Sequence, residues 1–286
     1  MMSMLSHRDA RIHVELLGDG RRKVRVELLT PGLYMPVQSC VTAYPEEMIQ
    51  RILELKDPTY LCDEILREES PDYVQRALYF DLLSYCDPQD FAGRRLLDFG
   101  CGAGASTMIL ARMFPQSCIV GIELEERLLS IAKLRARHYG YDNVELLLSP
   151  SPQSLPDDLG TFDFVVLSAV YEHLLPAERC AVLRQIWDSL RVGGTLFLNQ
   201  TPSRYFPVET HTTGLPLINY LPDRLALLYA RSASKAKLGS SDWDELLRRG
   251  IRGGSVREIM GLLSGGAGQH RHEGAGQRAL ADASAQ

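Results

Sequence analysis

Long apolar stretches are missing from this sequence of 286 residues. The most apolar one, residues 162–171, is much shorter than the roughly 20 residues that a helix needs to cross a bilayer. The N-terminus also lacks the charged segment and apolar core of a secretory signal. These absences predict a protein without a membrane span that stays in the cytoplasm.

An excess of positive charge and closely paired cysteines are missing as well. The net charge at pH 7 is −5 and the pI is near 5.8, whereas nucleic-acid binding proteins usually carry a basic surface. The six cysteines do not have the spacing of a zinc site or a disulfide framework, which predicts reduced thiols. The composition therefore favours a small-molecule partner over nucleic acid, and leaves a homodimer open.

The patterns along the chain predict four regions. Alternating apolar residues followed by helical spacing predict a hairpin and a helical cap within residues 1–88. Residues 89–200 repeat a short apolar run, a turn and an amphipathic segment, as in parallel strands joined by crossovers. Residues 201–264 are expected to hold a substrate loop and C-terminal helices, and the Gly- and Ala-rich residues 265–286 a disordered tail.

The second region defines the fold class. Its apolar runs are almost continuous, which is typical of parallel strands covered on both faces. The sequence therefore predicts an α/β fold, a Rossmann-like doubly wound sheet that is mainly parallel. The five predicted strands are residues 95–99, 118–122, 144–148, 162–168 and 195–199.

A glycine-rich turn follows the first of these strands, in Asp98-Phe99-Gly100-Cys101-Gly102-Ala103-Gly104. Glycines let the backbone approach a ligand where a Cβ would intrude. Asp98 is placed to accept hydrogen bonds from a cationic amino-acid group. Glu123 ends the next strand, about 20 residues further on, where a carboxylate can bind both hydroxyls of a ribose. Together they predict an adenosine site; the alternative is two solvated acids at strand ends.

Residues 96–200 resemble class I S-adenosylmethionine-dependent methyltransferases, especially ubiquinone-biosynthesis O-methyltransferases. The matching segments are residues 98–104, Glu123, Phe162-Asp163, Glu172-His173-Leu174 and residues 190–194. The resemblance implies a methyltransferase with S-adenosyl-L-methionine as its cofactor. The cofactor-binding residues it implies are Asp98, Gly100, Cys101, Gly102, Gly104, Glu123, Leu124, Ser151 and Ser168.

Three features depart from the family pattern. Ser149-Pro150-Ser151 stands where family members often have an acidic residue for the adenine amino group, and Ser151 is expected to take that role. Ala169 stands where the metal-assisted quinone branch has a glutamate, so no metal is expected. The family sheet usually ends with two more strands, but no strand is evident after residue 200. The hairpin at residues 11–29 is therefore hypothesised to supply edge strands.

The candidate catalytic residues follow the fourth and fifth predicted strands. His211 is the first candidate for a general base, with Glu209 as its orienting carboxylate and Tyr205 as a wall or hydrogen-bond donor. The alternative is a proline-stiffened loop in which His211 and Glu209 only tie down the backbone. His173 is the second candidate, beside Glu172; the alternative is a packed ring next to a helix-capping acid.

The sequence as a whole predicts methyl transfer to a small polar or amphipathic acceptor, with oxygen as the favoured atom. Secondary-metabolite, quinone or surface-glycan biosynthesis would use such a reaction. An NAD(P)-dependent oxidoreductase also fits the glycines and Glu123, but the sequence lacks a Tyr-x-x-x-Lys pattern for hydride transfer. A non-catalytic methyltransferase-like partner protein is the third reading, which Asp98 and Glu123 oppose.

Overall fold

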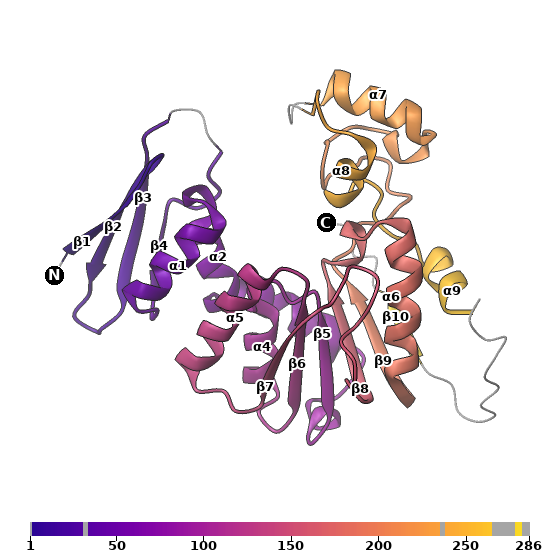
Figure 1. Ribbon diagram of the computed structural model, residues 1–286, viewed down its shortest axis with the longest axis horizontal. Coiled ribbons are helices and arrows are strands. Elements are labelled where there is room, and N and C mark those ends of the chain that lie inside the picture. Colours follow the sequence, from indigo (N-terminus) through magenta and orange to yellow (C-terminus); the bar gives the residue numbers. More distant parts are fainter. Residues whose placement is uncertain (1, 31–33, 235–237, 265–277, 282–286) are drawn as a thin grey trace. The chain divides into compact units, whose positions relative to one another are not determined.

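The computed structural model describes residues 2–30, 34–234, 238–264 and 278–281 (Figure 1). The chain divides into two compact units. The first unit combines Met1–Gly93 with Cys101–Leu148, and the second combines Arg94–Gly100 with Ser149–Gln286. No helix in the described residues is long and apolar enough to cross a membrane.

The first unit contains an antiparallel sheet with the strand order β1-β2-β3-β4. The predicted hairpin is confirmed, because β2 and β3 pair with Ile12 opposite Val26 and Val14 opposite Val24, and all four side chains are buried. These strands form a sheet of their own, so the hypothesis that the hairpin supplies edge strands to the parallel sheet is wrong. The strands are β1 (Met2–His7), β2 (Ala10–Leu16), β3 (Arg22–Leu28) and β4 (Ser39–Thr42).

Short helices follow this sheet, as the helical spacing predicted. Pro58 and Pro71 each stand at the first turn of a short helix, where a proline costs no backbone hydrogen bond. Apolar side chains of these helices, among them Ile52 and Ile65, share a buried core with β2 and β3. The helices are α1 (Glu46–Lys56), η1 (Pro58–Tyr60), α2 (Leu61–Glu69), η2 (Pro71–Gln75), α3 (Arg76–Leu83) and η3 (Pro88–Phe91).

The first unit also holds two of the predicted parallel strands with their helices. β6 and β7 pair in parallel, with Ile119 opposite Val144. Helix α5 lies between them in sequence and ends at Gly140, whose left-handed backbone (φ 65°) closes the helix. The elements are α4 (Ala105–Met113), β6 (Cys118–Glu123), α5 (Glu126–Tyr139) and β7 (Val144–Leu148).

The second unit contains parallel strands in the order β10-β9-β8-β5. Helix α6 (Pro176–Ser189) connects β8 to β9, as a parallel crossover requires. With the parallel pair in the first unit, this confirms the predicted Rossmann-like α/β fold. The strands are β5 (Arg95–Phe99), β8 (Phe162–Ser168), β9 (Leu190–Asn199) and β10 (Arg278–Ala281).

Strand β10 corrects the expectation that no strand follows residue 200. It contains only four residues, Arg-Ala-Leu-Ala, which is too short to show the alternation that marks a strand. It pairs in parallel with β9. The rest of the disordered tail predicted for residues 265–286 lies outside the described residues.

Helices after β9 complete the second unit. The C-terminal helices predicted within residues 201–264 are present. Asp242 caps one of them, accepting a hydrogen bond from the backbone N–H of Glu245 at 2.8 Å. The elements that follow β8 outside the sheet are η4 (Tyr171–His173), η5 (Ile218–Tyr220), α7 (Asp223–Ala233), α8 (Trp243–Arg248) and α9 (Val256–Ser264).

Candidate functional site

The glycine-rich turn between β5 and α4 has a backbone that only glycine adopts easily. Gly100, Gly102 and Gly104 have φ angles of 72°, 56° and 87°, all in the left-handed region. A Cβ at Gly100 would lie 2.8 Å from the Val170 side chain, and one at Gly104 would lie 2.6 Å from the Ala132 Cβ. Helix α4 begins directly after Gly104, so its first N–H groups face the turn.

Replacing Gly104 with alanine is expected to lower the free energy of unfolding by about 2–4 kcal/mol, because left-handed strain and overpacking add. Gly102→Ala is the matched control, since a Cβ there meets nothing within 4 Å. It should cost about 1–2 kcal/mol, from backbone strain alone. Urea unfolding measures both, and equal losses would show that packing against Ala132 does not constrain the turn.

Glu123 holds the turn and the start of α5 at once. One carboxylate oxygen accepts a hydrogen bond from the Gly102 N–H at 2.7 Å. The other accepts from the N–H groups of Leu124 and Glu125, at 2.8 and 3.0 Å. An ionised carboxylate has about four acceptor positions, so three bonds leave one for a ligand hydroxyl. Sequence reasoning identified Glu123 but missed this support of the glycine turn.

The other predicted cofactor residues occupy varied surroundings. Asp98 is buried at the carboxyl end of β5. The Cys101 N–H donates to the Ile122 carbonyl at 3.0 Å, while the Leu124 side chain is exposed. Ser168 ends β8. The Ser151 hydroxyl lies 2.5 Å from that of Ser154, within its own turn.

The two histidines predicted as catalytic candidates, His173 and His211, lie together with Glu172 in the second unit. One ligand atom of each lies within 4.8 Å of the others. Glu172 and His173 follow β8, and His211 follows β9, so both segments leave the carboxyl edge of the parallel strands. Gly250 allows this approach, because a Cβ there would lie 2.6 Å from the His211 ring and 3.1 Å from Glu172.

Hydrogen bonds prepare this cluster for a proton or a cation. The Thr201 hydroxyl donates to one Glu172 oxygen at 2.9 Å, while the other oxygen, fully buried, has no hydrogen-bond partner among the described residues. The His173 Nδ1–H donates to the Arg248 carbonyl at 2.7 Å, which leaves a lone pair on Nε2. That Nε2 lies 3.8 Å from the unpartnered Glu172 oxygen.

Carboxylate and imidazole together are ligands for several divalent cations, and a partnerless buried oxygen is costly unless something binds it. The cluster can therefore hold a divalent cation. The expectation of no metal, which rested on Ala169 alone, is reopened by His211, a third ligand that lies far along the sequence. The sequence could have indicated this cluster, since the segments that carry Glu172, His173 and His211 follow parallel strands that end at the same edge of the sheet.

Glu209 does not orient the His211 ring. Its two oxygens accept hydrogen bonds from the backbone N–H groups of His211, Thr212 and Thr213, at 2.6–2.8 Å, and from the Thr213 hydroxyl. The carboxylate is buried and fully used by the backbone, as the alternative reading of this loop expected. The predicted orienting role is therefore wrong for the ring, and Glu209 shapes the loop that carries His211. The Tyr205 side chain is exposed.

Comparisons with known proteins give consistent matches. A family model described as a methyltransferase domain matches residues 96–194. The chain is 29% identical over 150 residues to carboxy-S-adenosyl-L-methionine synthase of Aliivibrio fischeri strain MJ11, covering 48% of this chain and 60% of the relative. It is 32% identical over 122 residues to ubiquinone biosynthesis O-methyltransferase of Xanthomonas campestris pv. campestris strain B100, covering 40% and 46%.

A solved structure, the YcgJ protein from Bacillus subtilis, overlaps 62% of this chain and 64% of its own, with a TM-score of 0.43 and 18% identity. The chain spans about half the length of the curated relatives it matches.

Proposed function

We propose that this chain is a class I S-adenosylmethionine-dependent methyltransferase that transfers the methyl group of S-adenosylmethionine to a small polar or amphipathic acceptor, at oxygen. The methyltransferase-domain match over residues 96–194 supports this proposal. The observation that carries this proposal is the left-handed glycine turn between Asp98 and Glu123. Secondary-metabolite, quinone or surface-glycan biosynthesis are the settings in which such a product is formed.

The donor is proposed to bind at the glycine turn. Asp98 would accept hydrogen bonds from the ammonium of its methionine part, and Glu123 would accept one from a ribose hydroxyl at its remaining position. Gly100, Cys101, Gly102 and Gly104 supply the backbone of the turn. Leu124, Ser151 and Ser168 complete the proposed set, with the hydroxyl of Ser151 turning from Ser154 to the adenine.

The acceptor is proposed to bind near Glu172, His173 and His211. The acceptor oxygen attacks the methyl carbon, its lone pair forms the new C–O bond, and the electrons of the S–C bond pass to sulfur. The hydroxyl proton must leave at the same time, and the His211 ring is the first candidate to take it. Alignment of the two reactants supplies much of the rate, worth roughly 7–11 kcal/mol in favourable intramolecular comparisons.

A divalent cation is the second proposal for this cluster, favoured by the partnerless Glu172 oxygen. Glu172, His173 and His211 would hold it, and it would acidify a bound hydroxyl. The protein is expected to bind one Mn²⁺ or Zn²⁺, measured by calorimetry. Glu172→Gln should abolish this, while Asp244→Asn, which removes an exposed carboxylate of α8 outside the cluster, should leave the stoichiometry unchanged. Equal binding by the unmodified protein and Glu172→Gln would contradict the cation site.

Calorimetry with S-adenosylmethionine, S-adenosylhomocysteine and NADH tests the donor. Binding of the first two without NADH supports a methyltransferase. Binding of NADH alone would overturn the proposal in favour of an oxidoreductase, and binding without turnover on any acceptor would favour a non-catalytic partner protein.

A further inference from the structure

Arg135 of helix α5 hydrogen bonds to the backbone of the glycine turn. Its side chain is completely buried in the first unit. One guanidinium nitrogen, Nη1, donates to the carbonyl of Ala103 at 2.8 Å. Ala103 stands between Gly102 and Gly104, and Gly104 itself packs on Ala132, one turn before Arg135 on the same helix. Helix α5 therefore supports the turn by packing at one residue and by a charged hydrogen bond at another.

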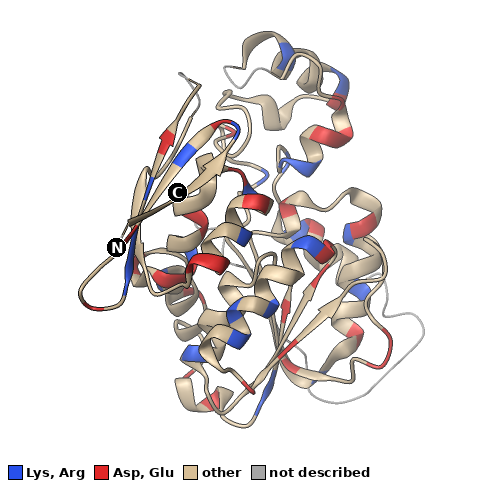
Figure 2. Cartoon of the chain, turned by 60° about the vertical axis from the view of Figure 1, so that its left-hand side comes forward, with Lys and Arg blue, Asp and Glu red and all other residues tan. Residues whose placement is uncertain are grey.

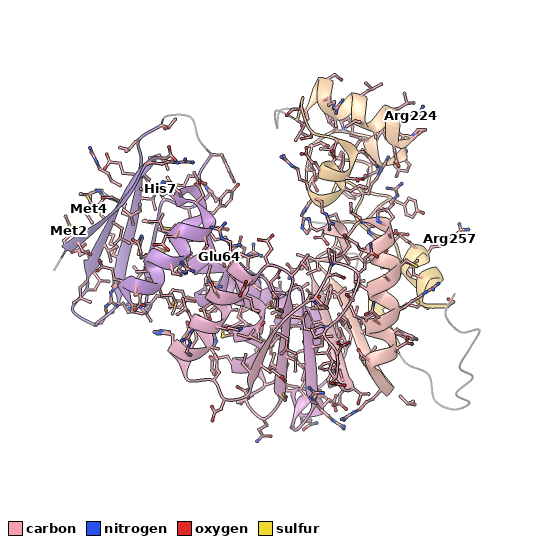
Figure 3. All side chains as sticks on the ribbon, viewed as in Figure 1. Met2, Met4, His7, Glu64, Arg224 and Arg257 are labelled. Carbon is pink, nitrogen blue, oxygen red and sulfur yellow. The ribbon has the colours of Figure 1, made fainter. Side chains whose placement is uncertain are left out.

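The same guanidinium reaches the helices that follow β4. Nη1 also donates to a Glu64 carboxylate oxygen at 3.0 Å, and Nη2 donates to the Glu64 carbonyl at 2.9 Å. Nε donates to the Tyr44 hydroxyl at 2.9 Å. Each of the three nitrogens thus has a partner. Figure 3 labels Glu64, which belongs to helix α2. One buried side chain thus joins α2 and Tyr44 to the glycine turn.

Further charges surround this link, and Figure 2 shows acidic and basic residues interspersed on the helices. Lys56 lies 3.2 Å from the second Glu64 oxygen. Burial would raise the pKa of the Glu64 carboxyl, but Arg135 and Lys56 outweigh it and lower that pKa below its usual value. Glu68 accepts from Tyr44 and, at 2.6 Å, from Arg112 of α4. Glu64 therefore keeps its charge, and the hydrogen bonds of the network connect helices α2, α4 and α5.

Stability alone does not account for this arrangement. Replacing a buried ion pair by apolar residues is often neutral or stabilising, so a buried pair that spans several elements calls for a positional explanation. Arginine suits it, because its planar fork presents five donors in fixed directions, whereas a lysine ammonium is a single point charge on a flexible stem. Without Arg135, the Ala103 carbonyl would lose its charged donor and Glu64 would remain buried without its nearest cation.

We propose that Arg135 is a positioning residue for the cofactor: it fixes the Ala103 carbonyl, and with it the glycine turn, and couples that turn to helix α2. This rests on the proposed donor site at the turn. Because coupling between two sites is reciprocal, occupation of the turn also orders α2, and disturbance of α2 near Glu64 weakens cofactor binding.

Calorimetric titration with S-adenosylhomocysteine tests the proposal. Arg135→Lys keeps the positive charge but loses the planar guanidinium with its fixed donors. The dissociation constant of this variant for S-adenosylhomocysteine should rise about tenfold or more, as expected for losing a charge-assisted hydrogen bond. Arg137→Lys is the matched control, because it makes the same change at an exposed arginine of α5 that donates to the Lys133 carbonyl, away from the turn. The affinity of Arg137→Lys should stay within about threefold of that of the unmodified protein. Equal affinity of Arg135→Lys and the unmodified protein would overturn the inference.

Hydrogen exchange gives a second readout on the unmodified protein, which holds even if Arg135→Lys does not fold. Addition of S-adenosylhomocysteine should slow exchange in the glycine turn and also in helix α2, residues 61–69. Slowing in the turn with no change in α2 would refute the coupling while leaving the proposed donor site intact. Absence of any binding by the unmodified protein would instead refute the donor site, and the role of Arg135 with it.

Discussion

Glu123→Gln is expected to weaken binding of S-adenosylhomocysteine by about 10- to 100-fold. The amide nitrogen that replaces one oxygen cannot accept the Gly102 N–H or a ribose hydroxyl, and charged hydrogen bonds of this kind are worth about 1.5–3 kcal/mol each. The dissociation constant measured by calorimetry gives the result directly. The loss combines a direct contact with the ligand and the support that Glu123 gives to the turn.

Glu125→Gln serves as the control for Glu123→Gln. Glu125 is the next glutamate along the chain, and its backbone N–H, which donates to Glu123, is unchanged by the substitution. Its affinity should match that of the unmodified protein. If Glu123→Gln also binds with unchanged affinity, Glu123 does not touch the cofactor and the turn does not depend on its carboxylate.

His211→Ala is expected to lower the turnover rate about 10²- to 10⁴-fold, the usual contribution of a positioned general base. Because His211 lies in the proposed acceptor region, affinity for S-adenosylhomocysteine should stay within about threefold of the unmodified value. Formation of S-adenosylhomocysteine from S-adenosylmethionine, with a panel of catechols and hydroxyquinones as acceptors, measures the rate.

His13→Ala is the matched control for His211→Ala. His13 lies on β2 and contacts the Glu27 carboxylate at 3.3 Å, outside the cluster. Its turnover should be unchanged. A His211→Ala variant that keeps full turnover would remove His211 from the mechanism, and a parallel His173→Ala measurement would then show whether the second histidine takes the proton.

The fold was largely predictable from the sequence because most of its parallel strands are buried on both faces. Such strands are nearly continuously apolar, so β5, β6, β8 and β9 stand out between their turns. Strand β7 is only half-buried, but four of its five residues are still apolar. Strand β10 does not stand out, because pairing with β9 determines its conformation while its four residues show no pattern. Sequence patterns therefore predict strands that are marked by their own apolar residues, and miss a strand such as β10 that forms only by pairing with another strand.

The candidate site was predictable in its parts and less so in its connections. The glycines of residues 100–104, Glu123 and the two histidines can be identified in the sequence, because glycine-rich turns and titratable side chains directly after predicted strands are typical of ligand sites. The hydrogen bonds of Glu209 could not be predicted, because they depend on how its loop folds back and turns three successive backbone N–H groups toward this one carboxylate. Arg135 and Glu64 are 71 residues apart in sequence, and nothing in either segment marks them as partners.

The proton on His173 is placed by a residue much later in the chain. The Arg248 carbonyl, 75 residues away, accepts the Nδ1–H and thereby sets which nitrogen of the ring is free. The methyltransferase-domain match ends at residue 194, well before this carbonyl and before Gly250. A fragment trimmed to the matched boundaries would keep the glycine turn and His173 but lose the Arg248 carbonyl that sets the tautomer of the ring. The proposed donor and acceptor sites therefore depend on different lengths of the chain.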